Sequence, residues 1–335
     1  MILTYKIKHN RDFSDELAKA RLVAEYALKH RKFSSALVKH IGLKSIISNQ
    51  ILRKYGKNKK IKKISRVKLS IPSQGIKLNR ENSTIYIPCL KLFLEYQFPE
   101  FNKINQIELS ENYAFVAVTV TERPQIQPEK WLGIDLNTTG HCCVASIPTT
   151  GKVLKLGRKS HHTHKKYKNQ RKRLQKKKSF KLLKKIKNRE SRIVCDLNHK
   201  ISRKVVNYAV KNKAGIVLEN LSGIRKNKKQ ARSFKYSLHS WSFYQLKTFI
   251  GYKAKLLGIP VVEIDPAYTS QQCSRCGLLG NRNKKHFKCL SCKHVEDADV
   301  NASFVVALRH QGILRLLTDR DVSKGNTDIP KEATI

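Results

Sequence analysis

The stretch "CSRCGLLGNRNKKHFKCLSCKHVEDADVNAS", Cys273 to Ser303, places two Cys-x-x-Cys pairs just before an Asp-x-Asn. Its cysteines follow the spacing C-x2-C-x12-C-x2-C, at Cys273, Cys276, Cys289 and Cys292. Two such pairs separated by a short hairpin have the spacing of a tetrahedral zinc site, whereas a redox pair is typical of one Cys-x-x-Cys alone. Four thiolates leave no ligand position for water. The sequence therefore predicts one structural Zn²⁺ in a zinc ribbon over residues 269–294.

The remaining cysteines lie in apolar or strand-like surroundings, at Cys89, Cys142, Cys143 and Cys195. There a cysteine usually acts as a small buried hydrophobic residue, so we assign these four no function. The chain length, the uneven cysteine spacing and the absence of a secretory signal in "MILTYKIKHN" argue against disulfides. We therefore expect a cytoplasmic protein.

The charge of the chain is strongly positive. Its 69 Lys and Arg against 24 Asp and Glu give a formal net charge of +45. This excess is far larger than solubility requires, and it indicates a polyanionic partner. No run approaches the roughly 18 apolar residues of a membrane span, so we expect no membrane partner. Composition alone also fits a general RNA-coating protein.

The basic residues are concentrated in Arg158–Arg192, which holds 17 Lys and Arg and one acid, Glu190. Helix-forming residues dominate this segment, and it contains no Gly or Pro, which favours helices that face phosphates. A disordered basic arm is the alternative. A second basic run, Gly56–Lys68, is either a solvated linker or a further phosphate contact.

The N-terminal third is expected to be a wedge-like β-barrel with helices inserted. Leu3, Tyr5 and Ile7 alternate with polar residues, and alternation returns in "TIYIPCLKLFLEY" and in "NQIELSENYAFVAVTVTE", which predicts a hairpin at "SEN". Between these segments lies one helical pattern, followed by a second pattern of two helices joined by a turn at Gly42. The second pattern is either a helix-turn-helix or a plain helical hairpin. The predicted limits are 1–10 and 66–127 for the barrel and 11–65 for the helical insert.

From Trp131 onward, strands and helices alternate. The predicted strands are 131–140, 141–147, 152–157, 216–220 and 259–265, and the predicted helices are 199–215, 238–257 and 300–312. We expect the helix 199–215 to end at Gly215, because glycine is a common residue at helix ends. The overall prediction is a multi-domain α+β chain whose α/β domain spans 128–268 and 295–312, with a tail at 313–335.

Three acids stand at the ends of these elements: Asp135 after a strand, Glu219 after another, and Asp299 at the start of the last helix. Each alone could be a turn or cap residue. In so basic a chain, acids at the ends of apolar elements are costly unless they are paired or bound to metal. Oxygen ligands suit Mg²⁺ or Mn²⁺, and two such ions roughly 4 Å apart would support phosphodiester hydrolysis.

The sequence resembles the TnpB (OrfB) proteins of insertion sequences, relatives of the type V CRISPR effector nucleases. The similar residues are "GIDLNTTG", "HKISRKVV", "IVLENLSGI", "DPAYTSQQCSRCG" and "DADVNAS", within about residues 131–310. A looser similarity covers the N-terminal helices and barrel. In that family the first Asp, the Glu of "LEN" and the Asp of D-x-N-A form a RuvC-like active site, and these fall on Asp135, Glu219 and Asp299.

The resemblance implies an RNase H-like (RuvC) nuclease domain with an inserted zinc ribbon. It also implies a prokaryotic, nucleoid-associated endonuclease that carries a guide RNA from the transposon end and cuts target double-stranded DNA. Two departures stand out: Ser303 and Val305-Val306 replace the usual Ala and Asn-Ile, and the helical insert is short. A non-cleaving nucleic-acid-binding repressor and an RNA-independent transposase or resolvase are the alternatives.

The ribbon and the last acid are adjacent because Asp299 starts a helix directly after the cysteines. A zinc ribbon stays folded without a large core, so it can fix the chain just before that helix. We also expect the ribbon to hold four basic side chains in fixed positions for contact with nucleic acid: Arg275, Arg282, Lys284 and Lys285.

Overall fold

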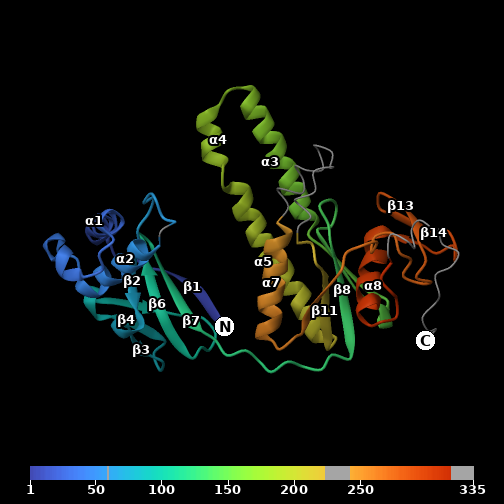
Figure 1. The fold of residues 1–335 in the computed structure, drawn as a ribbon, viewed down its shortest axis with the longest axis horizontal. Coiled ribbons are helices and arrows are strands. Elements are labelled where there is room, and N and C mark those ends of the chain that lie inside the picture. The colour runs from blue at the N-terminus through green and yellow to red at the C-terminus, as the bar shows by residue number, and fades with distance from the viewer. Residues whose placement is uncertain (59, 223–241, 318–335) are drawn as a thin grey trace. The chain divides into compact units, whose positions relative to one another are not determined.

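The computed structural model describes residues 1–58, 60–222 and 242–317 (Figure 1). Two compact units make up the chain, one of residues 1–121 and one that begins at Glu122. Most of the predicted tail, and residues 238–241 of a predicted helix, lie outside the described residues. None of the described helices is both long and apolar enough to cross a membrane.

The first unit contains two antiparallel sheets that share one hydrophobic core. The larger has the order β1-β7-β6-β2, with β1 Ile2–Lys8, β7 Tyr113–Thr119, β6 Lys103–Leu109 and β2 Leu69–Pro72. The smaller has the order β3-β4-β5, with β3 Lys77–Asn79, β4 Thr84–Ile87 and β5 Leu92–Glu95. Alternation explains the packing: Ala114, Val116 and Val118 are buried, and the residues between them are only partly so.

The sequence predicted most of these strands, and β6 and β7 form the hairpin expected at residues 110–112. The segment 84–96 is two strands, because Pro88–Leu90 forms a 3-10 turn between β4 and β5. Helices α1 (Ser14–His30) and α2 (Ser45–Lys57) follow β1, separated by the 3-10 helix Ser35–Ile41. The first helix of the expected helix, turn, helix pattern is therefore a 3-10 helix, and Gly42 turns the chain with φ +74°.

The second unit is built on a mixed sheet with the order β10-β9-β8-β11-β12. Its strands are β8 Lys130–Leu136, β9 Cys143–Ile147, β10 Lys152–Leu156, β11 Ala214–Glu219 and β12 Val261–Ile264. Strands β8, β9 and β10 pair antiparallel, whereas β11 runs parallel to β8 and β12. The central strands are buried along their length, as expected when helices cover both faces.

Helix α8 (Ala298–His310) packs on β8 and β9, and α5 (Arg189–Lys211) and α7 (Phe243–Leu256) pack against each other on the other side of the sheet (Figure 1). Gly133 makes the close approach of α8 possible, since a Cβ there would lie 2.1 Å from the carbonyl oxygen of Ser303. Gly133, in the middle of β8, thus lets α8 lie directly against the sheet.

The helices of the second unit differ from the prediction at their boundaries. The helix expected to stop at Gly215 ends at Lys211, and Gly215 lies inside β11, where a Cβ would meet the Trp131 ring. Close strand packing, not helix termination, explains this glycine. The basic segment is helical as expected, but it is divided into α3 (Arg158–Lys176), α4 (Phe180–Ile186) and the start of α5.

The cysteine-rich segment forms a small three-stranded sheet before α8. Its strands are β13 Gly280–Asn283, β14 His286–Cys289 and β15 Val295–Asp297. Phe287 is fully buried there, and its few apolar neighbours include Ala298 and three of the cysteines. A core this small needs a further crosslink or a metal to be stable.

Candidate active site and metal centre

The three acids singled out in the sequence lie at one edge of the second unit. Asp135 is the second-last residue of β8 and Glu219 is the last of β11. These strands are parallel with Leu218 opposite Ile134, so both acids stand at the same carboxyl edge. Asp299 lies in the first turn of α8, which packs on β8. Residues 164 positions apart along the chain therefore meet through the sheet and the helix on it.

All three acids are buried, with exposed fractions of 7% for Asp135, 8% for Glu219 and 3% for Asp299. Burial, together with the charges of Glu219 and Asp299, raises the pKa of Asp135 well above its usual value. Burial also raises the pKa of Glu219. Crowded carboxylates of this kind disfavour their own ionised forms, and a bound divalent cation would reverse that. The residues present therefore fit a Mg²⁺ or Mn²⁺ site.

Positive side chains from the ribbon contact the last of these acids. The Asp299 carboxylate accepts a hydrogen bond of 3.0 Å from the Arg282 guanidinium and another from the Lys285 ammonium. These are two of the four cations that we expected to contact nucleic acid, and in this structure they pair with a buried carboxylate. A metal ion at Asp299 would have to compete with both.

Three further side chains contact or influence the acids, and sequence reasoning missed them. Asn137 donates to Asp135 over 2.7 Å, and the Thr269 hydroxyl donates to Glu219. Burial raises the pKa of Glu219, and the positive charge of Arg309 partly opposes that rise. Burial also lowers the pKa of Arg309 itself to about 10. Asn137 is two residues from Asp135, which was an available signal, whereas nothing along the chain links Thr269 or Arg309 to Glu219.

The four cysteines form a second centre. Their sulfur atoms all lie within 4.8 Å of one another, with Cys273 and Cys292 3.6 Å apart and Cys276 and Cys289 3.5 Å apart. A disulfide requires roughly 2.05 Å, whereas sulfurs bound tetrahedrally to zinc at roughly 2.3 Å lie about 3.8 Å apart. Among the described residues, the three carboxylates do not form such a close group.

The thiols are chemically suited to a metal. Burial raises the pKa of Cys273 and raises that of Cys276 to about 11, so a nearby cation is needed to hold these sulfurs as thiolates near neutral pH. The donor set and the spacing fit Zn²⁺ with all four positions taken by sulfur. Zinc at this position would be structural.

Hydrogen bonds connect the ribbon that carries the cysteines to the start of α8, where Asp299 lies. Strand β14 pairs with β15, and the Ala298 amide at the start of α8 donates to the Lys285 carbonyl over 2.9 Å. The side chain of Asp297 caps α8 by accepting from the Asp299 amide over 3.0 Å. The ribbon therefore fixes the first turn of the helix that carries Asp299.

Asn301 makes a second connection between the same parts. It is fully buried, and its amide accepts from the Ser274 backbone N–H over 2.9 Å and donates to the Gln272 carbonyl over 2.7 Å. Ser274 lies inside the first Cys-x-x-Cys pair. The Asp-x-Asn motif thus places Asp299 at the acidic edge and uses Asn301 to hold the cysteine loop against α8.

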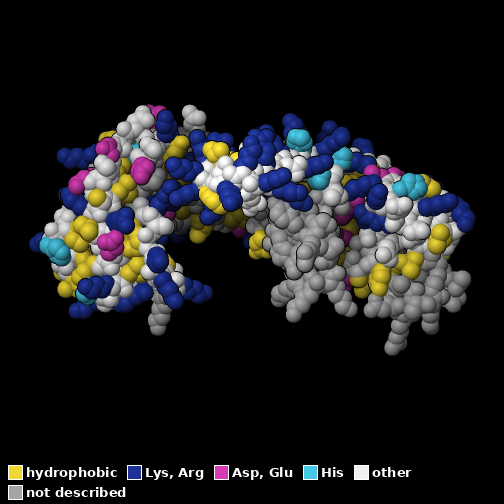
Figure 2. Space-filling model, turned by 90° about the horizontal axis from the view of Figure 1, so that it is seen from above, with side chains coloured by type: hydrophobic (Ala, Val, Ile, Leu, Met, Phe, Trp, Pro, Cys, Tyr) yellow, Lys and Arg dark blue, Asp and Glu magenta, His cyan; other side chains and the backbone are white. Residues whose placement is uncertain are grey.

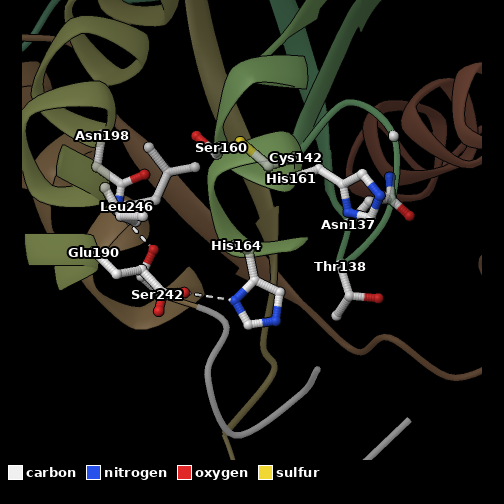
Figure 3. Close-up of a pocket in the computed structure, with 12 residues that line it drawn as sticks. Asn137, Thr138, Cys142, Ser160, His161, His164, Glu190, Asn198, Ser242 and Leu246 are labelled. Carbon is white, nitrogen blue, oxygen red and sulfur yellow. Dashed lines mark hydrogen bonds and ion pairs between the residues drawn. The ribbon is translucent and has the colours of Figure 1, made fainter. Parts of the chain in front are cut away.

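A polar pocket lies beside the acidic edge, between the β8–β9 loop and helices α3 and α5 (Figure 3). Asn137 lines it and also contacts Asp135, so pocket and acids adjoin. On the helix side, His164 Nδ1 lies 2.7 Å from Glu190 Oε1, and Arg171 also pairs with Glu190. Although burial opposes ionisation, these two partners hold the pKa of Glu190 below its usual value. The cluster locks α3 against α5.

On the face shown in Figure 2, basic side chains far outnumber acidic ones. Figure 2 shows Lys and Arg spread across the visible face, with few Asp and Glu among them. A groove between α3 and α4 illustrates this, since its charged lining residues are Lys166, Arg173, Lys185 and Arg189. It contains no acid, and Asn169 and Gln170 add hydrogen-bonding groups. Such a groove suits a phosphate backbone.

Comparison with known proteins shows where the similarity lies. Residues 243–306 match the family model described as Cas12f1-like, TNB domain. The chain is 35% identical over 175 residues to the TnpB-like protein MJ0751 of Methanocaldococcus jannaschii, which is 49% of this chain and 63% of the relative. It is 40% identical over 115 residues to a CRISPR-associated endodeoxyribonuclease Cas12f1 of Sulfoacidibacillus thermotolerans, which is 33% of this chain and 26% of the relative.

A longer but weaker similarity, 25% over 263 residues, links 69% of the chain to 63% of the putative RNA-guided DNA endonuclease InsQ of Escherichia coli. The chain thus spans less than two thirds of the length of these relatives. Among solved structures, a Cas12f1–sgRNA–target DNA complex matches with a TM-score of 0.62 at 18% identity, covering 88% of this chain and 82% of that one. The fold is therefore a mixed α/β, multi-domain fold like that of Cas12f1.

Proposed function

Because the chain belongs to the TnpB-like (OrfB) family related to the type V CRISPR nucleases, we propose that it is a transposon-associated, RNA-guided DNA endonuclease. The observation that supports this most directly is the convergence of Asp135, Glu219 and Asp299 at one buried edge. Relatives named as endonucleases and as RNA-guided agree with the proposal.

In this proposal the three acids are the catalytic residues and hold Mg²⁺ or Mn²⁺. Two such ions would supply the positive charge that activates water and stabilises the leaving oxygen of a phosphodiester. The chain's own groups prepare the site: Asn137 orients Asp135, and Thr269 orients Glu219. Arg282 and Lys285 pair with the Asp299 carboxylate and hold it in place.

The domain division follows from the same proposal. Residues 128–268 and 295–312 form an RNase H-like, RuvC-type nuclease domain, and 269–294 form the zinc ribbon with its Cys273, Cys276, Cys289 and Cys292 centre. We assign 1–10 and 66–127 to a wedge-like barrel with 11–65 as its helical insert, and the predicted tail, 313–335, lies mostly outside the described residues. The placement of the acids after β8 and β11 and at the start of α8 supports the RuvC assignment.

The nucleic-acid partners are a guide RNA from the transposon end and target double-stranded DNA. The acid-free groove between α3 and α4 would bind a phosphate backbone without reading sequence. Sequence reading would then fall to base pairing with the guide, as in other RNA-guided nucleases. The net charge of +45 supports a large polyanionic partner.

The test is purification of the protein with its nucleic acid, sequencing of the bound RNA, and a Mg²⁺-dependent cleavage assay before and after ribonuclease treatment. We expect one discrete RNA species and cleavage that is lost when the RNA is removed. Full DNA cleavage by RNA-free protein would favour the transposase or resolvase alternative. Binding without cleavage would favour the repressor, although all three acids are present.

A further inference from the structure

The smaller sheet of the first unit carries an unusual exposed row of side chains. The register of β3, β4 and β5 places Lys77, Tyr86 and Phe93 side by side across the three strands. The Tyr86 and Phe93 rings are stacked, with centroids 4.2 Å apart and an interplanar angle of 20°. Phe93 is 68% exposed. On the opposite face, Ile85, Ile87, Leu92 and Leu94 are buried in the core.

Folding alone does not account for this row. The buried residues on the opposite face already pack this sheet against the core. A pair of side chains across neighbouring strands can stabilise a sheet without a large aromatic ring exposed to water. Leaving a phenylalanine mostly in water gives up most of the stabilisation that its burial would provide. Exposed, stacked aromatic residues on a sheet face are typical of surfaces that stack nucleobases.

The surroundings of Phe93 fit a nucleotide. A groove beside it is lined by Lys8 at the end of β1 and Asn10 just after it, and by β5 together with Gln97, which follows that strand. Asn10 and Gln97 offer amide groups to base edges, and Lys8 offers a cation to a phosphate. Lys77 has no ion pair among the described residues, so its ammonium is also available. Glu95 is the acid that lines this groove.

We propose that Tyr86 and Phe93, with Lys77 and the adjoining groove, form a stacking site for an unpaired base of single-stranded nucleic acid. A base against the outer face of Phe93 extends the existing stack, and the flanking lysines hold its phosphates. Because β5 is an edge strand of its sheet, one side of the stack has no neighbouring strand. This inference rests on the proposed function in that it assumes a nucleic-acid partner, and it assigns part of that partner to a particular surface.

The test uses full-length protein freed of bound RNA, with short single-stranded RNA and DNA of mixed sequence and matching abasic oligonucleotides. Phe93→Ala and Tyr86→Ala should each weaken binding of base-containing strands roughly 5- to 30-fold, the scale of one lost base stack, with little change for abasic strands. Tyr244→Ala is the matched control, because this residue on α7 is 69% exposed and has no place in the row. It should bind like wild type.

Phe93→Trp provides a direct readout that does not depend on a loss of binding. It should retain affinity, and its added fluorescence, relative to wild type, should be quenched by base-containing strands but not by abasic ones. Thermal melts of each variant exclude unfolding as the cause. A stronger effect with RNA places an unpaired part of the guide on this site, and a stronger effect with DNA places an unpaired DNA strand there.

Two results overturn the inference: equal binding by wild type and both alanine variants, or equal quenching by base-containing and abasic strands. Either leaves the proposed nuclease function intact if the wild-type protein still carries RNA and cleaves. Failure of the proposed function is a different result, namely a wild-type protein that carries no RNA and cuts no DNA.

Discussion

Two neighbouring centres in the second unit, the cysteine cage and the acidic edge, are built in opposite ways. The four cysteines come from one stretch of twenty residues, 273–292, and their sulfur atoms lie within 4.8 Å of one another. The three acids come from two strands and a helix, and the sheet order brings them together. One centre is made by local sequence and the other by the fold.

The electrostatic balance of the two centres differs as well. In the cage, burial raises the pKa of Cys273 and of Cys276, so a metal ion is needed to hold these two sulfurs as thiolates. The acidic edge has its own cations, since Arg282 and Lys285 pair with Asp299 and Arg309 lies near Glu219. Loss of zinc from the cage should therefore unfold the cage locally, whereas loss of divalent metal from the acidic edge should leave that edge folded.

The largest expected effect is on catalysis by the acidic edge. Asp135→Ala, Glu219→Ala or Asp299→Ala should each reduce Mg²⁺-dependent DNA cleavage by roughly 1,000-fold or more, since each removes a proposed metal ligand. Nucleic-acid binding should change little, because phosphate contacts lie elsewhere. Cleavage and binding are measured on the same preparations.

Asp297→Ala is the control for that prediction. Asp297 caps α8 and pairs with Lys155, so its loss should cost about 1 kcal/mol of stability and leave most of the cleavage. An indispensable Asp297 together with a dispensable Asp299 would show that the wrong acid has been placed in the site.

The next largest effect concerns the cage. Cys276→Ser should release about one zinc ion per chain and reduce cleavage, since the ribbon holds the first turn of α8 through Ala298 and Asp297. RNA binding should suffer less. Elemental analysis, cleavage and RNA-binding assays decide this together, and Cys195→Ser, a half-buried cysteine on α5, is the control. A wild-type protein without zinc, or a zinc-free variant with normal cleavage, would remove the structural role.

A smaller effect should come from the residue that couples the two centres. Asn301→Ala leaves the Ser274 amide and the Gln272 carbonyl without their buried partner, which should lower the free energy of unfolding by roughly 2–4 kcal/mol. Asn301→Asp keeps the acceptor for Ser274 and should be less damaging if no new repulsion with the acids arises. Thermal melts measured with zinc content test this, and unchanged melting in Asn301→Ala would disprove the coupling.

The smallest effect is expected at Glu190, an acid that is held by cations and lies outside both centres. Its pKa is lowered in the folded state, so its contribution to stability is present above about pH 4.5 and is lost as the pH falls through the folded value. The melting temperatures of wild type and Glu190→Gln should therefore differ at pH 7 and converge at acid pH. The same gap at every pH would contradict this, and Glu129→Gln, at an exposed acid, is the control.

Sequence alone was sufficient where the physical cause is local. Cysteine spacing predicted that the four cysteines form one group, helix-forming composition predicted the basic helices, and alternation predicted the β6–β7 hairpin. It failed where a residue's neighbours are remote. Gly215 was interpreted as a helix stop, but its reason is the Trp131 ring on the adjacent strand.

The three acids lie between these cases. Their positions at element ends were visible in the sequence, but their proximity depends on the parallel pairing of β8 with β11 and on α8 packing against Gly133. Tertiary structure alone decided what contacts them, including the Arg282 and Lys285 pairs with Asp299 and the position of Arg309 near Glu219. Charges act through space, and spacing along the chain does not encode the distances between elements that only packing brings together.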